Sequence, residues 1–252
     1  MNANQKLLGF CVIATAIANC SFGEMIFTRD GRKLTATAEG SGWRLIDLGG
    51  SFEFVTLHDK DQKTAAPTSP YSDFTATIAA EGGVSGAGAR SEAFQRSRIE
   101  PLAFFANLSA FAQARARNPG GSSSSANAFA IGESIFDIGF RLTSSHEFNY
   151  NGYGFVELTK QGMGTVFHAM RDGVNGVVSG VLGPGEYTLY GIASERGDAG
   201  ANGESYIGGK DFTFQMTFSP VPDNPSTGPL LGLGLLTLHF LRRGQSGTPC
   251  RR

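Results

Sequence analysis

The stretch FANLSAFAQARARN (residues 105–118) decides between a helical fold and a fold built from strands. Alanine or leucine occupies every second position, and the residues between them are large or polar. The apolar set is Ala106, Leu108, Ala110, Ala112, Ala114 and Ala116. An amphipathic helix is the alternative, because alanine and arginine form helices readily. The strict period of two favours a half-buried strand, so this stretch predicts a β-strand.

The same alternation recurs along the chain. It is seen in KLTATAE (33–39), SFEFVTLH (51–58), SDFTATIA (72–79), SIFDIGFRLT (134–143) and KDFTFQMTFSP (210–220). Shorter segments bounded by glycine follow the same pattern, namely GFVELTK (154–160), GTVFHAM (164–170) and EYTLYGIAS (186–194). These segments predict an all-β protein of about ten short strands, arranged as an antiparallel β-sandwich or jelly roll over residues 24–219. The apolar face of each strand, with Phe52 and Phe54 among its members, is expected to supply the core.

Composition sets limits on the class of protein. The chain has 252 residues, 35 glycines, 20 phenylalanines and a net charge of −1. This length suits one domain with a sizeable core, and the absence of a basic stripe argues against a nucleic-acid partner. The cysteines are Cys11, Cys20 and Cys250, so the region between Cys20 and Cys250 holds no disulfide, cysteine zinc site or cysteine nucleophile.

Residues 1–23 have the layout of a secretory signal peptide. Lys6 precedes the apolar segment 7–18, and Ala18 and Gly23 are small residues suited to cleavage. The apolar segment is shorter than the roughly 20 residues of a transmembrane helix. A buried N-terminal helix or strand is the alternative. A lipoprotein site at Cys20 is disfavoured by the large Asn19 that precedes it.

The C-terminal residues 220–252 have the features of a sorting signal rather than of a folded domain. The apolar run 229–241 has 13 residues, and a helix of that length reaches only about 20 Å. The hydrocarbon core of a bilayer is roughly 30 Å thick. Arg242 and Arg243 follow the run and would act as a positive-inside stop. A short transmembrane helix that is later cut fits this pattern; an uncut anchor and a buried apolar strand are the alternatives.

This segment, VPDNPSTGPLLGLGLLTLHFLRR (221–243), resembles the PEP-CTERM sorting signal of Gram-negative bacteria. That signal has a Pro-Glu-Pro core, then Ser and Thr, a helix rich in glycine and leucine, and arginines. Here the core reads Pro-Asp-Asn-Pro. The residues that the resemblance assigns to recognition and processing are Val221, Pro222, Asp223, Asn224, Pro225 and Ser226. The segments FDIGFRLTSSHEFNYNG (136–152) and GVLGPGEYTLYGIAS (180–194) also resemble the β-rich ectodomains of such proteins.

The resemblance implies a route and a destination. Export by the Sec pathway would be followed by a transient inner-membrane anchor. An exosortase, which is a membrane-embedded cysteine transpeptidase, would then process the C-terminus. Delivery would be to the cell surface or to the exopolysaccharide matrix, where such proteins are typically non-enzymatic and linked to biofilm or floc formation. We therefore expect a structural or adhesive role in that matrix.

Catalytic motifs are sparse in the body. The chain has no HExxH, GxSxG or P-loop pattern, and we expect neither a cofactor nor a firm metal site. Asp59 with Asp61 is a weak calcium candidate, for which a solvated loop is the more ordinary interpretation. A second weak calcium candidate combines Asp198, Asn202 and Glu204.

Two alternative functions stay open. A secreted glycoside hydrolase would need a pair of carboxylates, for which the candidates by residue type alone are Glu133, Asp137, Glu147 and Glu157. A surface carbohydrate-binding module would need stacking aromatic residues. The only tryptophan, Trp43, is expected in the core rather than on a platform.

Overall fold

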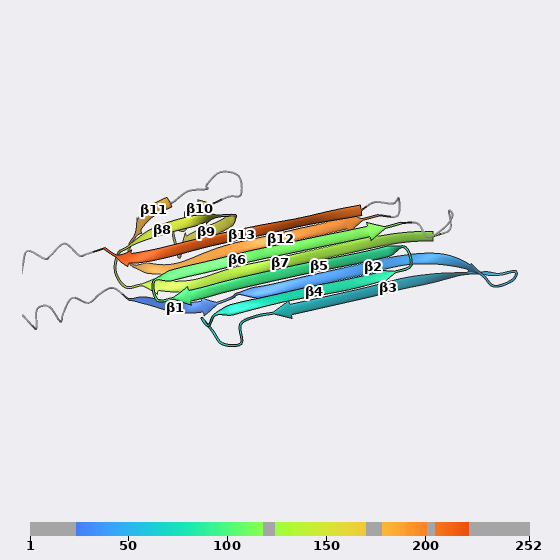
Figure 1. Ribbon diagram of the computed structural model, residues 1–252, viewed down its shortest axis with the longest axis horizontal. Helices are drawn as coiled ribbons and strands as arrows, with labels where there is room; N and C mark the ends of the chain where they lie inside the picture. The colour runs from blue at the N-terminus through green and yellow to red at the C-terminus, as the bar shows by residue number, and fades with distance from the viewer. Residues whose placement is uncertain (1–23, 118–123, 170–177, 201–204, 222–252) are drawn as a thin grey trace, which may run out of the picture.

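The protein is a β-sandwich (Figure 1). The computed structural model describes residues 24–117, 124–169, 178–200 and 205–221. Over these ranges the chain forms thirteen strands and no helix. The strands make two antiparallel sheets that pack face to face, which confirms the predicted fold class.

The first sheet has seven strands in the order β10-β9-β12-β7-β2-β3, with β1 also paired to β7. Its strands are β1 (Met25–Asp30), β2 (Lys33–Asp47), β3 (Phe52–Ala65), β7 (Ser124–Leu142), β9 (Phe155–Lys160), β10 (Gly164–Ala169) and β12 (Gly185–Ala199). The second sheet has six strands in the order β11-β8-β13-β6-β5-β4. Its strands are β4 (Phe74–Val84), β5 (Ala87–Glu100), β6 (Ala103–Ala116), β8 (His146–Tyr153), β11 (Val178–Leu182) and β13 (Ser205–Pro220).

The strands are more numerous than the predicted ten, and most of them are longer than predicted. β7 alone has 19 residues and β13 has 16. Several glycines that resemble turn signals lie inside strands, at places where the facing sheet comes close. A Cβ on Gly132 of β7 would run into the backbone carbonyl oxygens of Glu92 and Phe111. Such glycines allow close approach of two backbones rather than ending a strand.

The core has two halves of different composition. One half is built from large side chains, with Phe104 at its centre in ring contact with Phe136, Phe140 and Phe218. The other half is built almost entirely from alanine, with members Ala36, Ala38, Ala80, Ala87, Ala89, Ala112, Ala114, Ala116, Ala126, Ala128, Ala130 and Ala199. There the sheets lie so close that a Cβ on Gly82 would be 2.6 Å from the carbonyl oxygen of Ala38. The predicted apolar faces of β6, β7 and β13 are all buried, as expected.

A buried ion pair fixes the corner between β1 and β2. The guanidinium of Arg32 is 2% exposed and donates two hydrogen bonds to the carboxylate of Asp30, at 2.9 and 2.7 Å. It also donates to the carbonyl oxygen of Ser72 at 2.7 Å and to the hydroxyl of Ser97 at 3.1 Å. Burial alone would raise the pKa of Asp30, but the hydrogen bonds from Arg32 and from the Tyr71 N–H outweigh it and hold the pKa below its ordinary value. This network ties the start of the first sheet to β5 and to the loop before β4.

Candidate functional site

The residues assigned to sorting lie at the boundary of the described chain. Val221 is the last described residue, and its N–H donates to the carbonyl oxygen of Ser145 at 2.9 Å. The signal peptide (1–23), the motif residues 222–226 and the arginines 242 and 243 lie outside the described residues. Within the part of the chain that the structure does describe, no helix is long and apolar enough to cross a bilayer.

Both ends of the folded body lie at the same pole, which we call the terminal pole. β1 begins with Met25 paired to Leu142, and β13 ends with Pro220 paired to His146. The hairpin between β2 and β3 projects from the opposite pole (Figure 1). The long axis of the described body therefore runs from the pole where β1 begins and β13 ends to this hairpin.

The tip of this hairpin, residues 43–56, is named the distal hairpin. Its turn is closed by the Leu48 N–H, which donates to the carbonyl oxygen of Ser51 at 2.8 Å. The carboxylate of Asp47 accepts a hydrogen bond from the N–H of Gly49 at 2.8 Å, and Gly49 has a φ of +81° that favours glycine. Among the described residues, β2 pairs with β7 as far as Arg44 and with β3 as far as Asp47.

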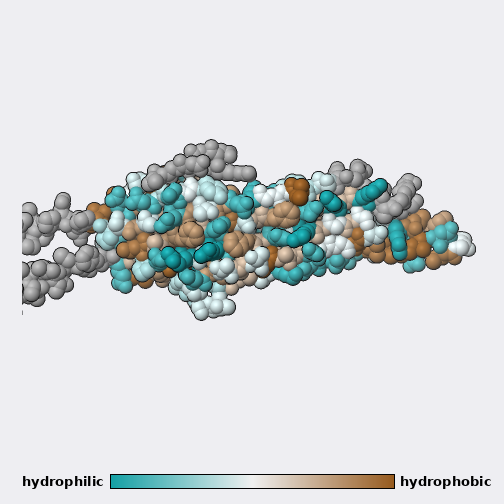
Figure 2. Space-filling view, viewed as in Figure 1, coloured by the Kyte–Doolittle hydropathy of each residue, from teal (hydrophilic) through white to brown (hydrophobic). Residues whose placement is uncertain are grey.

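Large apolar side chains are exposed on the distal hairpin. Phe52 is 67%, Phe54 69%, Leu48 60% and Trp43 37% exposed. The rings of Trp43 and Phe54 are 5.5 Å apart between centroids, on one face of the ribbon. Figure 2 shows the resulting hydrophobic colour gathered at that end of the molecule. No other part of the described chain combines three exposed large apolar residues within one turn and its flanking strands.

The predictions that Trp43, Phe52 and Phe54 belong to the core are therefore wrong. The reason is the face of the sheet on which they lie. The buried residues Ala36 and Ala38 mark the inner face of β2, and Trp43 lies on the other face of that strand. Trp43 pairs with Thr56, so Phe52 and Phe54, at alternate positions before Thr56, share its outward face. The alternation in SFEFVTLH correctly predicts a strand, but it does not reveal which face of that strand the second sheet covers.

Three of the four candidate carboxylates share the outer face of the first sheet. Asp137 of β7 pairs with Tyr190 of β12, Tyr190 pairs with Glu157 of β9, and Glu157 pairs with His168 of β10. Asp137 and Glu157 are thus two strands apart, which corresponds to about 10 Å between their backbones. Glu133 lies four residues from Asp137 on the same face of β7, whereas Glu147 lies on β8 of the other sheet.

Two of these carboxylates, Asp137 and Glu157, already have partners on an open sheet surface. Arg29 donates to Asp137 at 2.5 Å, and the hydroxyl of Thr165 donates to Glu157 at 2.5 Å. Burial raises the pKa of Tyr190, and the negative charges of Asp137 and Glu133 add to that rise. The arrangement is a row of polar cross-strand pairs, and it does not bring the four candidate carboxylates, all of them in the described part of the chain, together across a cleft.

The calcium candidates Asp59 and Asp61 are engaged with backbone. Asp59 accepts a hydrogen bond from the N–H of Gly83 at 2.8 Å, and Asp61 accepts one from the N–H of Glu81 at 3.3 Å. Lys63, two residues further on, donates to the carbonyl oxygen of Ala79 at 2.7 Å. Among the residues described, no group of three or more His, Cys, Asp or Glu side chains is arranged to hold a metal ion. Asp198 of the second candidate pairs with Arg196, and residues 202 and 204 lie outside the described ranges.

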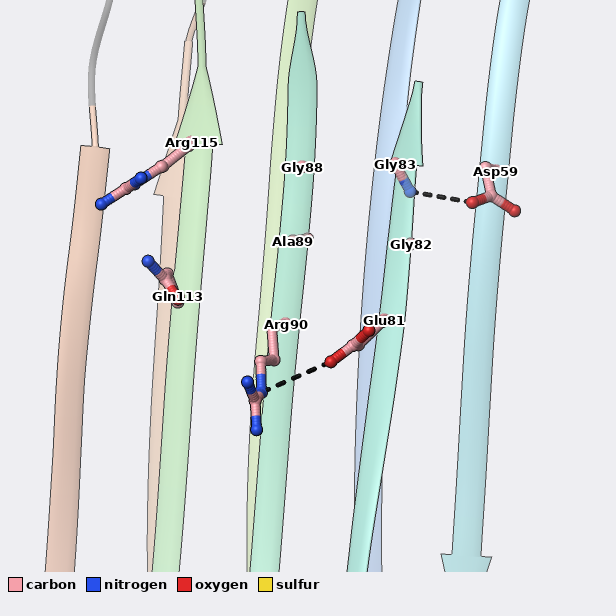
Figure 3. Close-up of a pocket in the computed structure, with 9 residues that line it drawn as sticks. All are labelled: Asp59, Glu81, Gly82, Gly83, Gly88, Ala89, Arg90, Gln113 and Arg115. Carbon is pink, nitrogen blue, oxygen red and sulfur yellow. Dashed lines mark hydrogen bonds and ion pairs between the residues drawn. The ribbon is translucent and has the colours of Figure 1, made fainter. Parts of the chain in front are cut away.

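An open hollow of about 510 Å³ lies beside Asp59 on the outer surface of β4, β5 and β6 (Figure 3). Glu81 and Arg90 form an ion pair across it at 3.6 Å. Gln113 and Arg115 of β6 contribute the remaining long polar side chains. Charged and polar side chains share this lining with glycine and alanine, and the hollow is open to solvent, without the enclosing hydrophobic and aromatic walls typical of small-molecule sites.

Comparisons of the chain with protein families, curated proteins and solved structures gave no match.

Proposed function

We propose that this protein is exported, sorted to the cell surface and serves a non-enzymatic structural or adhesive role in the extracellular polysaccharide matrix. The observation that supports this proposal most directly is the polarity of the sandwich. β1 begins and β13 ends at the terminal pole, and the apolar distal hairpin lies at the other. A surface attachment through residues 222–252 would direct the distal hairpin away from that surface.

The dimensions of the body suit such a role. β7 has 19 residues, and at about 3.3 Å per residue it spans roughly 60 Å. An elongated body of this kind holds a contact site at a distance from the point of attachment. The proposed partner in processing is an exosortase acting on Pro222–Pro225, and the proposed surroundings are exopolysaccharide.

Intact mass of the protein recovered from its native cells tests the sorting step. We expect the wild type to lack the residues after about position 225, and a Pro222→Ala, Pro225→Ala variant to remain full length in the membrane fraction. Pro101→Ala, in the exposed turn between β5 and β6, is the matched control and should be processed normally. If the wild type keeps its C-terminus, the proposed processing does not occur.

A surface carbohydrate-binding role is the second candidate, and the exposed pair Trp43 and Phe54 favours it. Aromatic faces that reach solvent can stack on sugar rings. Binding of matrix polysaccharides that is lost in Trp43→Ala, and kept in Tyr153→Ala, would support this candidate. Tyr153 is a fair control because it is an exposed aromatic residue on β8, in the other sheet.

A further inference from the structure

We propose that the distal hairpin binds the distal hairpin of a second copy of this chain, through antiparallel pairing of the outer edge of β3 with itself. The inference names the partner of the adhesive contact, and for its biological setting it rests on the proposed function. The pairing itself depends only on the described residues of the hairpin.

The outer edge of β3 is open where the apolar residues lie. β3 pairs with β2 on one side. Towards its C-terminal end, Asp59, Asp61 and Lys63 reach across to β4. Between Phe52 and Thr56, the described residues make no hydrogen bond to this edge. Unpaired N–H and C=O groups along a strand edge are a template for another strand.

The backbone alternation decides which residues present these groups. The hydrogen bond from the Leu48 N–H to Ser51 makes these two residues a bonded pair at the turn. Alternate residues of β3, beginning with Phe52 and continuing with Phe54 and Thr56, then direct their N–H and C=O groups away from β2. These outward groups belong to the residues whose side chains form the exposed aromatic face.

A two-fold axis near Phe54 gives a self-complementary contact. Antiparallel pairing about that point places Phe54 opposite its own copy, Phe52 opposite Thr56 and Glu53 opposite Val55. No two like charges are directly opposed, and an aromatic pair lies at the centre. Because β3 runs along the long axis of the molecule (Figure 1), antiparallel pairing sends the two terminal poles in opposite directions. Two molecules that are attached at their terminal poles to opposite surfaces could therefore meet through their distal hairpins and link those surfaces.

The exposed area fits a weak contact that gains strength from many copies. Phe52 and Phe54 are about two-thirds exposed, and a full aromatic side chain offers about 150–250 Å². With Leu48 and Trp43, one hairpin presents on the order of 400 Å² of apolar side chain. Two hairpins together bury less than the roughly 1,200 Å² of a standard interface, so each pair is weak. Many pairs between two surfaces add by multivalency.

The chemistry of the hairpin favours this partner over a lipid surface or a glycan. Asp47 and Glu53 flank the turn, and burying their charges in hydrocarbon is costly. Ile46, Val55 and Leu57 are half-buried aliphatic residues on the opposite face of the ribbon from the aromatic pair. A sugar platform uses one aromatic face, whereas a second ribbon of the same kind matches both the apolar side chains and the open backbone edge.

The test is a clustering assay with beads that carry the full-length chain, coupled through a tag at its C-terminus. Wild-type beads should cluster without any added polysaccharide. Phe54→Lys removes the central aromatic residue, and Thr56→Pro removes an outward N–H while leaving the apolar face intact. Each variant should weaken clustering by roughly tenfold or more. The matched control is Val181→Lys, at a residue 66% exposed on β11, and it should cluster like the wild type.

Beads of two colours decide whether the contact is between like hairpins. Wild-type beads should not recruit Phe54→Lys beads, although circular dichroism should show the same strand content for both. The proposal is overturned if wild-type beads fail to cluster, if they cluster only with added polysaccharide, or if they recruit the variant beads equally well. Bead display bypasses the sorting signal. Lost clustering therefore counts against the pairing alone, and an unprocessed C-terminus in native cells counts against the sorting alone.

Discussion

The carboxylate of Asp59 accepts a hydrogen bond from the backbone N–H of Gly83 at 2.8 Å, and it thereby joins the outermost strand of one sheet to the outermost strand of the other (Figure 3). Asp61 and Lys63 repeat the contact two and four residues further along β3. The hydrogen bonds from Lys63 and from the Glu81 N–H hold the pKa of Asp61 below its ordinary value. Three side chains thus occupy backbone groups that would otherwise form an open edge on β4.

Removal of these contacts should promote aggregation. Asp59→Ala with Asp61→Ala deprives the N–H groups of Gly83 and Glu81 of their acceptors and leaves the β4 edge open. We expect light scattering at moderate protein concentration to rise faster with time than for the wild type. Lys60→Ala is the control, because Lys60 lies on the same strand and faces the other way, towards Glu39. Equal scattering from all three proteins would contradict the role assigned to Asp59 and Asp61.

Because the two sheets approach closely, the effect of a glycine-to-alanine substitution on stability should depend strongly on the position of the glycine. Gly132→Ala forces a methyl group against carbonyl oxygens of Glu92 and Phe111, both of which belong to backbone that cannot easily shift. We expect the free energy of unfolding to fall by about 2–3 kcal/mol or more. Gly88→Ala is the control, since an added Cβ there meets nothing within 4 Å. Urea unfolding of both variants is the measurement, and a similar small effect at both positions would argue against the close packing.

The buried pair Asp30–Arg32 predicts a loss of stability in acid. The pKa of Asp30 in the folded protein lies below its ordinary value of 3.8. Its contribution to stability is therefore fully present above pH 3.8 and is lost as the pH falls through the lower folded value. Urea unfolding at a series of pH values should show this decline. Asp30→Asn should flatten the decline and lower stability at neutral pH by about 3–5 kcal/mol, because Arg32 is left buried without a counter-charge.

The exposed pair Asp198–Arg196 supplies the control for that experiment, since both side chains are mostly in solvent. Asp198→Asn should change neutral stability by less than about 1 kcal/mol. A pH profile for Asp30→Asn that matches the wild type would show that Asp30 does not couple folding to acid.

The buried Tyr150 predicts a loss of folding stability at strongly alkaline pH. Burial raises the pKa of Tyr150 to about 12, and its hydroxyl has no hydrogen-bond partner among the described residues. The stability that depends on the neutral phenol is present below pH 10.0 and is lost as the pH rises through about 12. Tyr150→Phe should leave stability at pH 7 unchanged, or raise it by up to about 1 kcal/mol.

The same variant should resist alkaline unfolding better than the wild type. Thermal unfolding followed by circular dichroism between neutral and strongly alkaline pH measures the difference. Tyr153→Phe is the matched control, because Tyr153 lies on the same strand and is 45% exposed. A clear destabilisation of Tyr150→Phe at pH 7 would mean that the hydroxyl has a stabilising partner.

The sequence predicts the strands wherever the alternation is long and one-sided. The apolar sets of residues 105–118, 134–143 and 210–220 lie on buried faces because a period of two is the direct consequence of the pleat. The strand ends were not predictable, because a glycine in a turn and a glycine at a close backbone contact look the same in one sequence. Gly132 is of the second kind.

The surroundings of the candidate site residues depend on contacts between segments that are distant in the sequence. The sequence alone therefore could not predict which of these residues are exposed and which lie close together. The exposure of Trp43 follows from which face of β2 the second sheet covers, and no residue near Trp43 in the sequence records that choice. The row from Asp137 through Tyr190 to Glu157 follows from the register of three strands. The sorting motif at residues 221–226 differs, because it is read from local order alone, and it stays a prediction.

The alignment of the strands with the long axis has a mechanical consequence. A molecule held at the terminal pole and gripped at the distal hairpin is pulled along its strands (Figure 1). Hydrogen bonds between antiparallel strands lie across that direction, so a tensile load shears a whole ladder at once instead of peeling its bonds one after another. The long ladder between β7 and β12, which extends from Gly185 to Ala199, would share such a load over its full length. The body is therefore stiffest in the direction in which a tether between two surfaces is stretched.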